Sequence, residues 1–531
     1  MSQNAKKQTF LHGAALLAGA TAIVKIIGAL YKIPLKMVIG DQGYSYFCTA
    51  YDIYSVLLMI STTGLPVAMS RMISQASSLG HYRQVRRVYN TARAIFLGLG
   101  LVSSLLMILF CRELAAFQQQ PNSWFAIMCL GPCAFLMGLM STYRGFFQGQ
   151  GNMIPTSYSQ VIEAVFKLVV GLIAAFAILH FTTSIPLAAG GAILGVTVSC
   201  VISSVYLWGC FRKAYGDLPQ TQEEVRSYGT TARQLLAIAV PITIGSAGLQ
   251  ILTVLETNLY MGQLLTVGGL SQDVAENMKG VYNMAQTIYN MPCAFIAPIT
   301  ISVIPAITSH LTLLNNRGVR STEESAARIT GLLSLPCSVG LIFLSQPIMA
   351  LLGGYSGEKL VLASQLMSLL GVSVFLHAVV LVTNAIMQAH GHANIPVVNM
   401  LCSGAVKLVL VYILTGNPAI GILGVPIGTA LCNLCISILN LFAISRCIPQ
   451  KPALIRNLLR SVLPAVLMGG AAYGSWWALS QVVASRVILC GAPIAAGGVV
   501  YVLCAVLFRS ITREDCLLLP KGERIARLLR L

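Results

Sequence analysis

Three lysines lie where a membrane-spanning helix would place them on one face. The stretch from Ile23 to Lys36 is almost entirely apolar apart from Lys25, Lys32 and Lys36. At 100° per residue, Lys32 and Lys36 fall within about 20° of Lys25 on a helical wheel, so the ammonium groups form one stripe. A lysine at the centre of a bilayer costs roughly 3 kcal/mol, so we expect Lys25 to face a water-filled cleft. We expect Lys36 to reach the interface instead.

A cationic stripe inside a membrane favours an anionic ligand. An ammonium group binds phosphate as a point charge, which makes a pyrophosphate-linked lipid a candidate. The acidic residues within apolar segments are few: Asp52, Glu163 and Glu256. Glu256 has no cation close to it in sequence. It therefore either neutralises the stripe or binds a coupling ion such as H⁺ or Na⁺.

Two further lysines and a set of amides lie within apolar segments. Glu163 and Lys167 are four residues apart, which predicts an ion pair with a structural role. Lys407 has no acidic residue near it in sequence, so its partner must come from another helix. Spacings of three and four place three amides on one helix face: Asn283, Gln286 and Asn290. Such amides often hold membrane helices together, and sugar binding is the alternative.

The cysteine and histidine pattern predicts neither a metal site nor a cofactor. The 15 cysteines are scattered through apolar segments, where Cys packs as a small hydrophobe. The pair Cys432 and Cys435 has the spacing of half a metal site, but no second pair accompanies it. We interpret His390 and His392 as loop residues, not as metal ligands.

The composition requires a membrane. Hydrophobic residues make up 56% of the 531 residues and charged residues only 9%, whereas roughly a quarter of the residues in soluble domains are charged. A bilayer is crossed by about 20 apolar residues. Fourteen segments meet that length, at residues 10–38, 46–70, 94–111, 124–147, 156–180, 186–211, 234–265, 281–307, 327–352, 361–388, 396–414, 419–445, 461–483 and 487–508. We therefore expect an all-α polytopic protein with 14 transmembrane helices.

The basic residues predict the orientation of these helices. Most of the 34 Lys and Arg fall in alternate loops, which indicates that both termini lie in the cytoplasm. The net charge of +18 is spread over many short loops, as expected beside anionic lipid headgroups, and does not indicate nucleic-acid binding.

A repeated segment indicates two lobes. The residues Gln148, Gly151, Pro155 and Lys167 recur 240 positions later, with one insertion, as Gln388, Gly391, Pro396 and Lys407. We expect a first six-helix lobe at 1–215, a cytoplasmic linker at 216–233, a second lobe at 234–446, and a helix pair with a basic tail at 447–531. Six spans return the chain to the same side, so a pseudo-two-fold axis would stand along the membrane normal beside a central cleft, as in transporters.

Several motifs carry a family resemblance. They are GALYKIPL at residues 28–35, GLPVAMSRMIS at 64–74, YRGFFQ at 143–148 and NMIPT at 152–156. They resemble stage V sporulation protein B and related polysaccharide-biosynthesis membrane proteins of Gram-positive bacteria. These belong to the multidrug/oligosaccharidyl-lipid/polysaccharide exporter superfamily, which also holds the lipid II flippase MurJ. Fourteen spans are similar to MurJ, whereas drug-extruding relatives commonly have twelve.

The resemblance implies a flippase in the bacterial plasma membrane. Its substrate would be an undecaprenyl-pyrophosphate-linked saccharide for cell-wall or spore-cortex synthesis, moved by alternating access. MurJ proteins carry cavity cations on helices 1, 2 and 8. Here helix 1 supplies Lys25 and Lys32, and helix 2 supplies Arg71 at its cytoplasmic end. Asp52 lies on helix 2 as well, whereas helix 8, placed at 281–307, has no cation.

Two other functions remain open at this point. A cation-coupled multidrug exporter of the same fold would use Glu256 as its key residue. A membrane enzyme acting on lipid-linked sugars would need acids or bases exposed at a membrane face, and the longest outer loop offers only Asp273 and Glu276. We therefore expect a transporter and not an enzyme.

Overall fold

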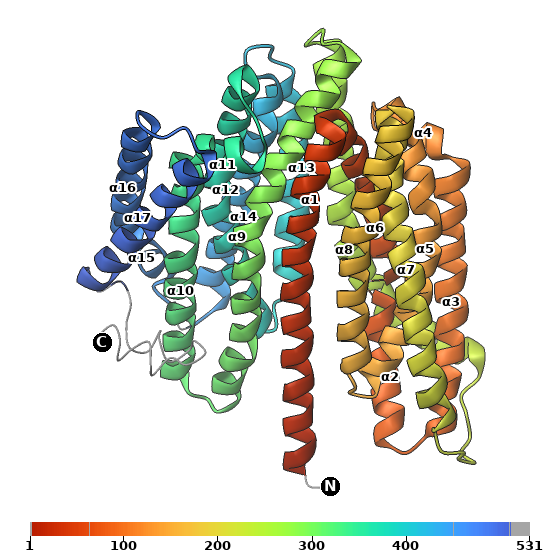
Figure 1. The fold of residues 1–531 in the computed structure, drawn as a ribbon. Helices are drawn as coiled ribbons and strands as arrows, with labels where there is room; N and C mark the ends of the chain where they lie inside the picture. The colour runs from red at the N-terminus through yellow and green to blue at the C-terminus, as the bar shows by residue number, and fades with distance from the viewer. Residues whose placement is uncertain (1–2, 63, 450, 509, 511–531) are drawn as a thin grey trace. The chain divides into compact units, whose positions relative to one another are not determined.

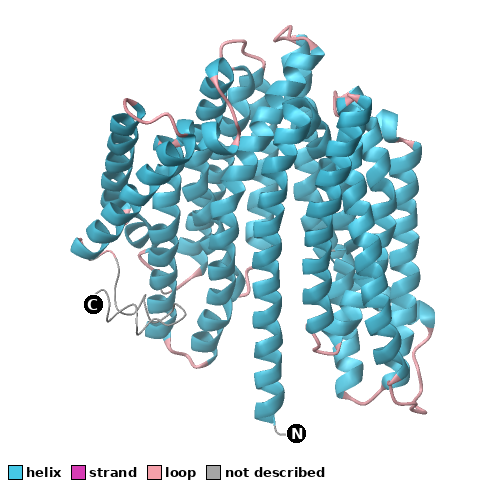
Figure 2. Cartoon of the chain, viewed as in Figure 1, coloured by secondary structure: helices cyan, strands magenta, loops and turns pink. Residues whose placement is uncertain are grey.

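The chain is helical throughout the part that can be described. The computed structural model describes residues 3–62, 64–449, 451–508 and 510. All regular elements of these residues are helices joined by loops (Figures 1 and 2). Eleven of the described helices are long and apolar enough to cross a membrane. The expected all-helical membrane architecture is confirmed, while the count of 14 spans and the orientation of the termini stay predictions.

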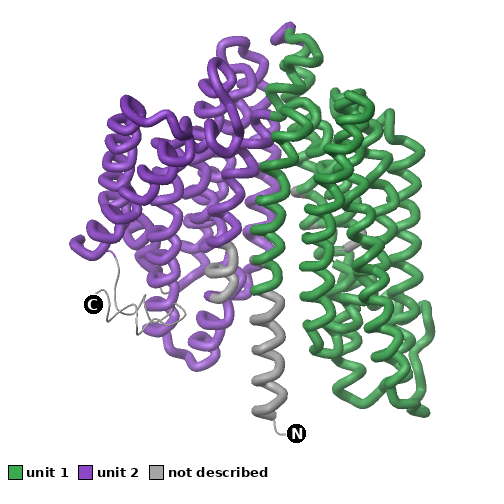
Figure 3. Tube along the Cα trace, viewed as in Figure 1, with its two compact units in different colours: residues 1–265, 270–280 green, residues 266–269, 281–531 purple. Residues whose placement is uncertain are grey.

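The chain packs as two compact units (Figure 3). Unit 1 comprises residues 1–265 and 270–280, and unit 2 comprises residues 266–269 and 281–531. This division falls later than the lobe boundary expected at 216–233, because helix α8 (Tyr228–Thr266) packs against α2 of unit 1. The approach is close: a Cβ added at Gly64 would lie 2.1 Å from the carbonyl oxygen of Ala239.

Unit 1 is built around the long helix α1 (Gln3–Thr62), which kinks at Gly40, where φ is 71°. The non-helical backbone at Gly40 separates two helical segments, which meet without the loop that hydropathy alone predicts between the two spans. The other helices of this unit are α2 (Gly64–Ser78), α3 (Tyr82–Leu109), α4 (Cys111–Phe117), the 3₁₀ helix η1 (Pro121–Ser123), α5 (Trp124–Gly149), α6 (Ile154–Thr182), α7 (Ile185–Gly216) and α8.

Helix α9 (Gln272–Thr312) begins in unit 1 and continues in unit 2. The other helices of unit 2 are α10 (Asn316–Phe343), α11 (Ser345–Leu352), α12 (Gly357–Ala389), α13 (Asn394–Thr415), the 3₁₀ helix η2 (Gly421–Leu423), α14 (Gly424–Cys447), α15 (Leu454–Leu459), α16 (Val462–Ser480) and α17 (Arg486–Leu507). A buried aliphatic cluster that includes Val319, Ile386, Ile444 and Leu454 joins α10, α12, α14 and α15.

The repeated sequence segment forms the same helix ending in both units. Gly151 follows α5 with φ of 77°, and Gly391 follows α12 with φ of 83°. In each copy the glycine N–H donates to the carbonyl of the repeated glutamine, Gln148 or Gln388, at 3.0 Å. Only glycine adopts this left-handed conformation at little cost, which explains why it occurs in both copies.

Candidate functional site

A polar network lies in unit 1 where the first turns of α9 meet the kink of α1. A Cβ added at Gly280 would lie 1.9 Å from the carbonyl oxygen of Asp41, so only glycine permits this approach. The approach buries Glu276 and Lys279 completely. Glu276 was expected in an outer loop, and Lys279 likewise precedes the span predicted at 281–307. Helix α9 begins before its apolar stretch, whereas hydropathy predicts only the apolar part of a helix.

Lys279 is a fully buried cation bonded to neutral oxygens. Its Nζ donates to Thr49 Oγ1 at 2.5 Å and to Gln120 Oε1 at 3.3 Å. Thr49 also donates to Gln120, and Gln120 Nε2 donates to Ser45 Oγ at 2.5 Å. These bonds replace the water that the ammonium group loses on burial. Helix 8, predicted from its apolar part at 281–307, was expected to carry no cation. That expectation is wrong, because the corresponding helix α9 begins at Gln272 and includes Lys279.

Glu276 is the acceptor at the centre of a second set of hydrogen bonds at this junction. Its carboxylate accepts from Tyr46 Oη at 2.5 Å, Gln42 Nε2 at 2.9 Å and Gln272 Nε2 at 2.8 Å. Gln42 also donates to Asp273 at 2.9 Å. The two acids of the predicted outer loop are thus bonded to α1, and Glu276 is not exposed as a catalytic acid would be.

The three lysines of the predicted stripe have different environments. Lys25 is exposed and Lys32 is half-buried. Lys36, expected at the interface, is instead buried and pairs with Asp41 at 3.2 Å. The pair spans Gly40, because the kink turns the following residues back toward the preceding turn of α1.

Charges from four helices of unit 1 meet around Asp52 and Lys32. Asp52 lies within electrostatic range of Lys32, Lys279 and the buried Glu256. Lys32 is also within range of Lys167 on α6. Among the described residues, no carboxylate lies within ion-pair distance of Lys32 or Lys167. One charged region of unit 1 therefore includes Lys32, Asp52, Glu256 and Lys167. Their separate positions in the sequence did not predict this grouping.

The expected ion pair between Glu163 and Lys167 is wrong. Glu163 instead pairs with Arg144 of α5 at 3.0 Å, and Arg144 Nε also donates to Ser159 Oγ at 3.1 Å. Lys167 lies 6.0 Å from the ring centroids of both Tyr31 and Tyr51. A planar guanidinium from a neighbouring helix reaches the carboxylate better than the local ammonium does.

Arg71, the predicted cation of helix 2, lines a different part of unit 1. It is exposed and borders a groove of about 980 Å³ formed by α2, α3, α8 and the linker before α8. The polar residues of that groove include His81, Gln84, Glu224, Arg226 and Gln234.

The remaining predicted residues belong to unit 2. Asn283 is buried and its Nδ2 lacks a hydrogen-bond partner, Gln286 is half-buried, and Asn290 is exposed. Lys407 is half-buried on α13, with its Cγ 3.8 Å from the position of a Cβ added at Gly428 of α14.

Sequence motifs gave no sign of Lys279, Glu276, Gln120 and Thr49 as a network. The one available signal was the spacing of Glu276 and Lys279, three residues apart, which puts them on one face if the helix extends that far.

Comparisons with known proteins identify the family. Residues 10–310 match the family described as polysaccharide biosynthesis protein. The stage V sporulation protein B of Bacillus subtilis (strain 168) is 24% identical over 97% of this chain and 98% of its own length. The lipid II flippase MurJ of the same organism is 25% identical over 93% of this chain and 94% of its own length.

Solved structures agree on the fold. A lipid II flippase MurJ in an inward closed conformation matches with a TM-score of 0.67 at 14% identity, over 93% of this chain and 99% of that one. An inward-facing multidrug resistance transporter of the same superfamily matches with a TM-score of 0.66 at 17% identity, over 82% and 95%. The chain therefore belongs to the polysaccharide biosynthesis protein family, as a multi-pass membrane protein with the fold of the multidrug/oligosaccharidyl-lipid/polysaccharide exporters.

Proposed function

We propose that the chain is a flippase that moves a lipid-linked saccharide of the undecaprenyl-pyrophosphate type across the membrane by alternating access. Family membership supports a transporter handling polysaccharide precursors. The pyrophosphate is the anionic part of such a substrate, so the protein needs accessible cations inside the membrane.

The observation that carries the proposal is the pairing of Lys32 and Lys167. Both are half-buried, they come from α1 and α6, and they lie within electrostatic range of each other. Neither ammonium group has a carboxylate in ion-pair contact among the described residues, which favours binding of a phosphate group in this region. Lys25, exposed two turns earlier on α1, would receive the head group first. The ammonium group of Lys279 donates to protein side chains. It would therefore add positive charge near the site without binding the substrate directly.

Unit 2 offers apolar space for an isoprenoid tail. One pocket of about 390 Å³ lies between the start of α17 and α9, α10 and α11, where its lining includes Met291, Leu341, Ile348 and Val487. A second, of about 310 Å³, is lined by residues such as Pro336 and Ala472, and includes α16. These pockets support a tail-binding role for the helix pair that has no counterpart in the repeat.

A cation-coupled multidrug exporter is the second candidate. Asp52 and Glu256 lie within electrostatic range of each other, which would suit a bound proton or metal cation. In the flippase the same two carboxylates would serve as the coupling site. Drug susceptibility separates these functions: an exporter loses drug resistance with Glu256→Gln and is insensitive to Lys32→Ala.

The first test is complementation in a bacterium depleted of its own lipid II flippase. We expect the parent chain to restore growth and Lys32→Ala or Lys25→Ala to abolish the rescue at matched membrane levels. Lys213→Ala is the control, because Lys213 is an exposed lysine of unit 1 at the end of α7.

Failure of the well-expressed parent would exclude lipid II as the substrate. Translocation of other labelled undecaprenyl-pyrophosphate saccharides in proteoliposomes then tests the wider class. Lack of movement for all of them would refute the flippase proposal.

A further inference from the structure

In the described part of unit 2, one buried carboxylate pairs with a histidine and not with a lysine or arginine. Glu323 of α10 has no exposed surface. Its Oε1 lies 2.7 Å from His390 Nε2, while its Oε2 has no hydrogen-bond partner. Among the described residues, His390 is the only basic group within ion-pair distance of it. A buried carboxylate in this state is costly, and such groups are often kept for a function.

His390 connects this carboxylate to the end of the helices. It caps α12, and its side chain keeps 8% of its surface exposed. Gly391 and the exposed His392 follow directly in the turn, so water is within reach of the imidazole. Imidazole is the side chain that ordinarily changes its charge between pH 5 and 8.

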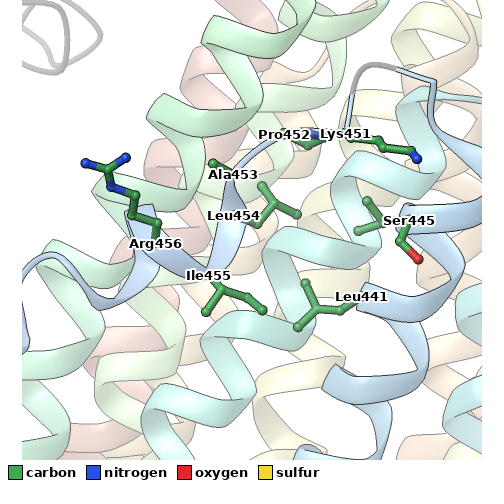
Figure 4. A pocket seen from close by; sticks show the side chains of 9 residues that line it. Leu441, Ser445, Lys451, Pro452, Ala453, Leu454, Ile455 and Arg456 are labelled. Atoms are coloured by element: carbon green, nitrogen blue, oxygen red, sulfur yellow. The ribbon is translucent and has the colours of Figure 1, made fainter.

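Other charged groups around the pair are held by their own contacts or lie at the surface. Arg320 pairs with Glu324 at 2.9 Å, and Arg328 donates to Ser325 at 2.7 Å. Lys451 and Arg456 lie at opposite ends of a pocket of about 400 Å³ with Leu454 and Ile455 between them (Figure 4). The other Arg, Lys, His and Glu residues of α10, α12 and the adjoining helix ends are His310, Arg317, Glu358, Lys359, His377, His392, Arg446 and Arg460. Among the described residues, His390 is therefore the ionisable group in direct contact with Glu323.

We propose that Glu323 and His390 form a proton-binding site that controls the junction of α10 and α12. The imidazole takes one proton from water at this end of unit 2, which converts a neutral imidazole beside a carboxylate into an imidazolium–carboxylate pair. The charge-assisted bond is about twice as strong as a neutral one, so the proton tightens the junction. Its release returns the proton to water and loosens the end of α12. No other atom is transferred.

The role of this site in transport rests on the proposed function, where it would supply a coupling proton. The binding of the proton by Glu323 and His390 does not depend on the proposed function. Hydrogen–deuterium exchange of the full chain in lipid nanodiscs measures it directly, at the backbone amides of residues 386–392 and after correction for the intrinsic effect of pH.

We expect exchange in the parent chain to slow severalfold as the pH falls from about 8 to about 5. Glu323→Gln and His390→Gln should exchange fast at every pH, and the exposed control His392→Gln should follow the parent. An unchanged pH response in His390→Gln, or no response in the parent, would overturn the proposal.

A double variant keeps the test informative if the single variants misfold. Glu323→Leu with His390→Leu replaces the pair by apolar groups, which is often neutral for stability. It should fold, pack normally and show no pH response at residues 386–392. A retained response in this variant also overturns the proposal. If the response is present in the parent but no lipid-linked saccharide is translocated, the proton site stands and the flippase proposal fails.

Discussion

The end of α5 in unit 1 lies beside an aromatic cluster, whereas the equivalent end of α12 in unit 2 lies beside the pair of Glu323 and His390. In unit 1, Tyr89 stacks on Phe211 at 4.5 Å and meets the Phe146 ring edge-on at 5.7 Å. In unit 2, the buried aliphatic cluster includes Val319 and Ile386, which lie about one turn from the pair along α10 and α12. The helix ending itself is the same in both.

This difference shows which parts of a duplicated segment are fixed by backbone geometry. The glycine after each helix is required by its left-handed φ, so both copies keep it. The neighbouring side chains carry no such requirement. One copy is packed by aromatic rings, and the other holds the pair of Glu323 and His390.

The largest effect should come from the aromatic cluster. We expect Tyr89→Ala to cost about 3–5 kcal/mol, as for other large aromatic truncations in a core, because Tyr89 is only 2% exposed. Thermal unfolding of the purified protein measures this. Phe442→Ala in unit 2, which removes a ring that is 56% exposed, is the control and should cost far less. Equal losses would refute the view that this end of unit 1 is a packing site.

The repeat lysines should differ in their effect on transport. Lys167 shares its surroundings with Lys32, whereas Lys407 lies on α13 of unit 2. Losing a charged hydrogen bond to phosphate costs about 1.5–3 kcal/mol, so Lys167→Ala should slow translocation of a labelled lipid-linked saccharide roughly tenfold or more. Lys407→Ala should leave the rate nearly unchanged. A larger loss with Lys407→Ala would reverse the assignment.

The shared helix endings should respond alike. Gly151→Val and Gly391→Val each place a β-branched residue in the left-handed region, at a cost of about 1–2 kcal/mol. Both variants should therefore lower the melting temperature by similar amounts. Gly209→Ala, in the interior of α7 where a Cβ meets nothing within 4 Å, is the control. A strongly unequal response would show that the two endings are not equivalent.

The smallest effect concerns the linker between α7 and α8 of unit 1. Glu223 accepts from the backbone N–H groups of Arg83 at 2.6 Å and Gln84 at 3.1 Å at the start of α3. Desolvation would raise the pKa of Glu223, but hydrogen bonds from Thr221 and these N–H groups outweigh it and lower the pKa. The contribution to stability is complete above the ordinary value of 4.5 and is lost as the pH falls through the lowered pKa.

Limited proteolysis of the linker tests this contact. We expect Glu223→Gln to be cut faster than the parent at neutral pH and equally fast in acid. Glu224→Gln, at the exposed neighbouring position, should behave as the parent does at neutral pH. Identical cutting of all three proteins would show that the cap does not hold the linker.

Hydropathy and the repeat determined the general architecture. A chain with 56% hydrophobic residues must bury its backbone polar groups in helices within a bilayer, so the helical membrane fold follows from composition. The repeated glycine and glutamine predicted matching segments, because a left-handed turn depends on local residues alone. The motifs around Gly28 and Gly64 were sufficient to predict the family.

Only the tertiary structure decided which charges meet. Arg144 replaces Lys167 as the partner of Glu163, and Lys279 is buried against Thr49, which lies 230 residues away in the chain. His390 lies in the turn after α12, as expected, and the fold also makes it the partner of Glu323. Sequence spacing describes neighbours along one helix, whereas a buried charge is satisfied by whichever helix packs against it. That choice is made by packing, and it decides which charged residues lie in contact.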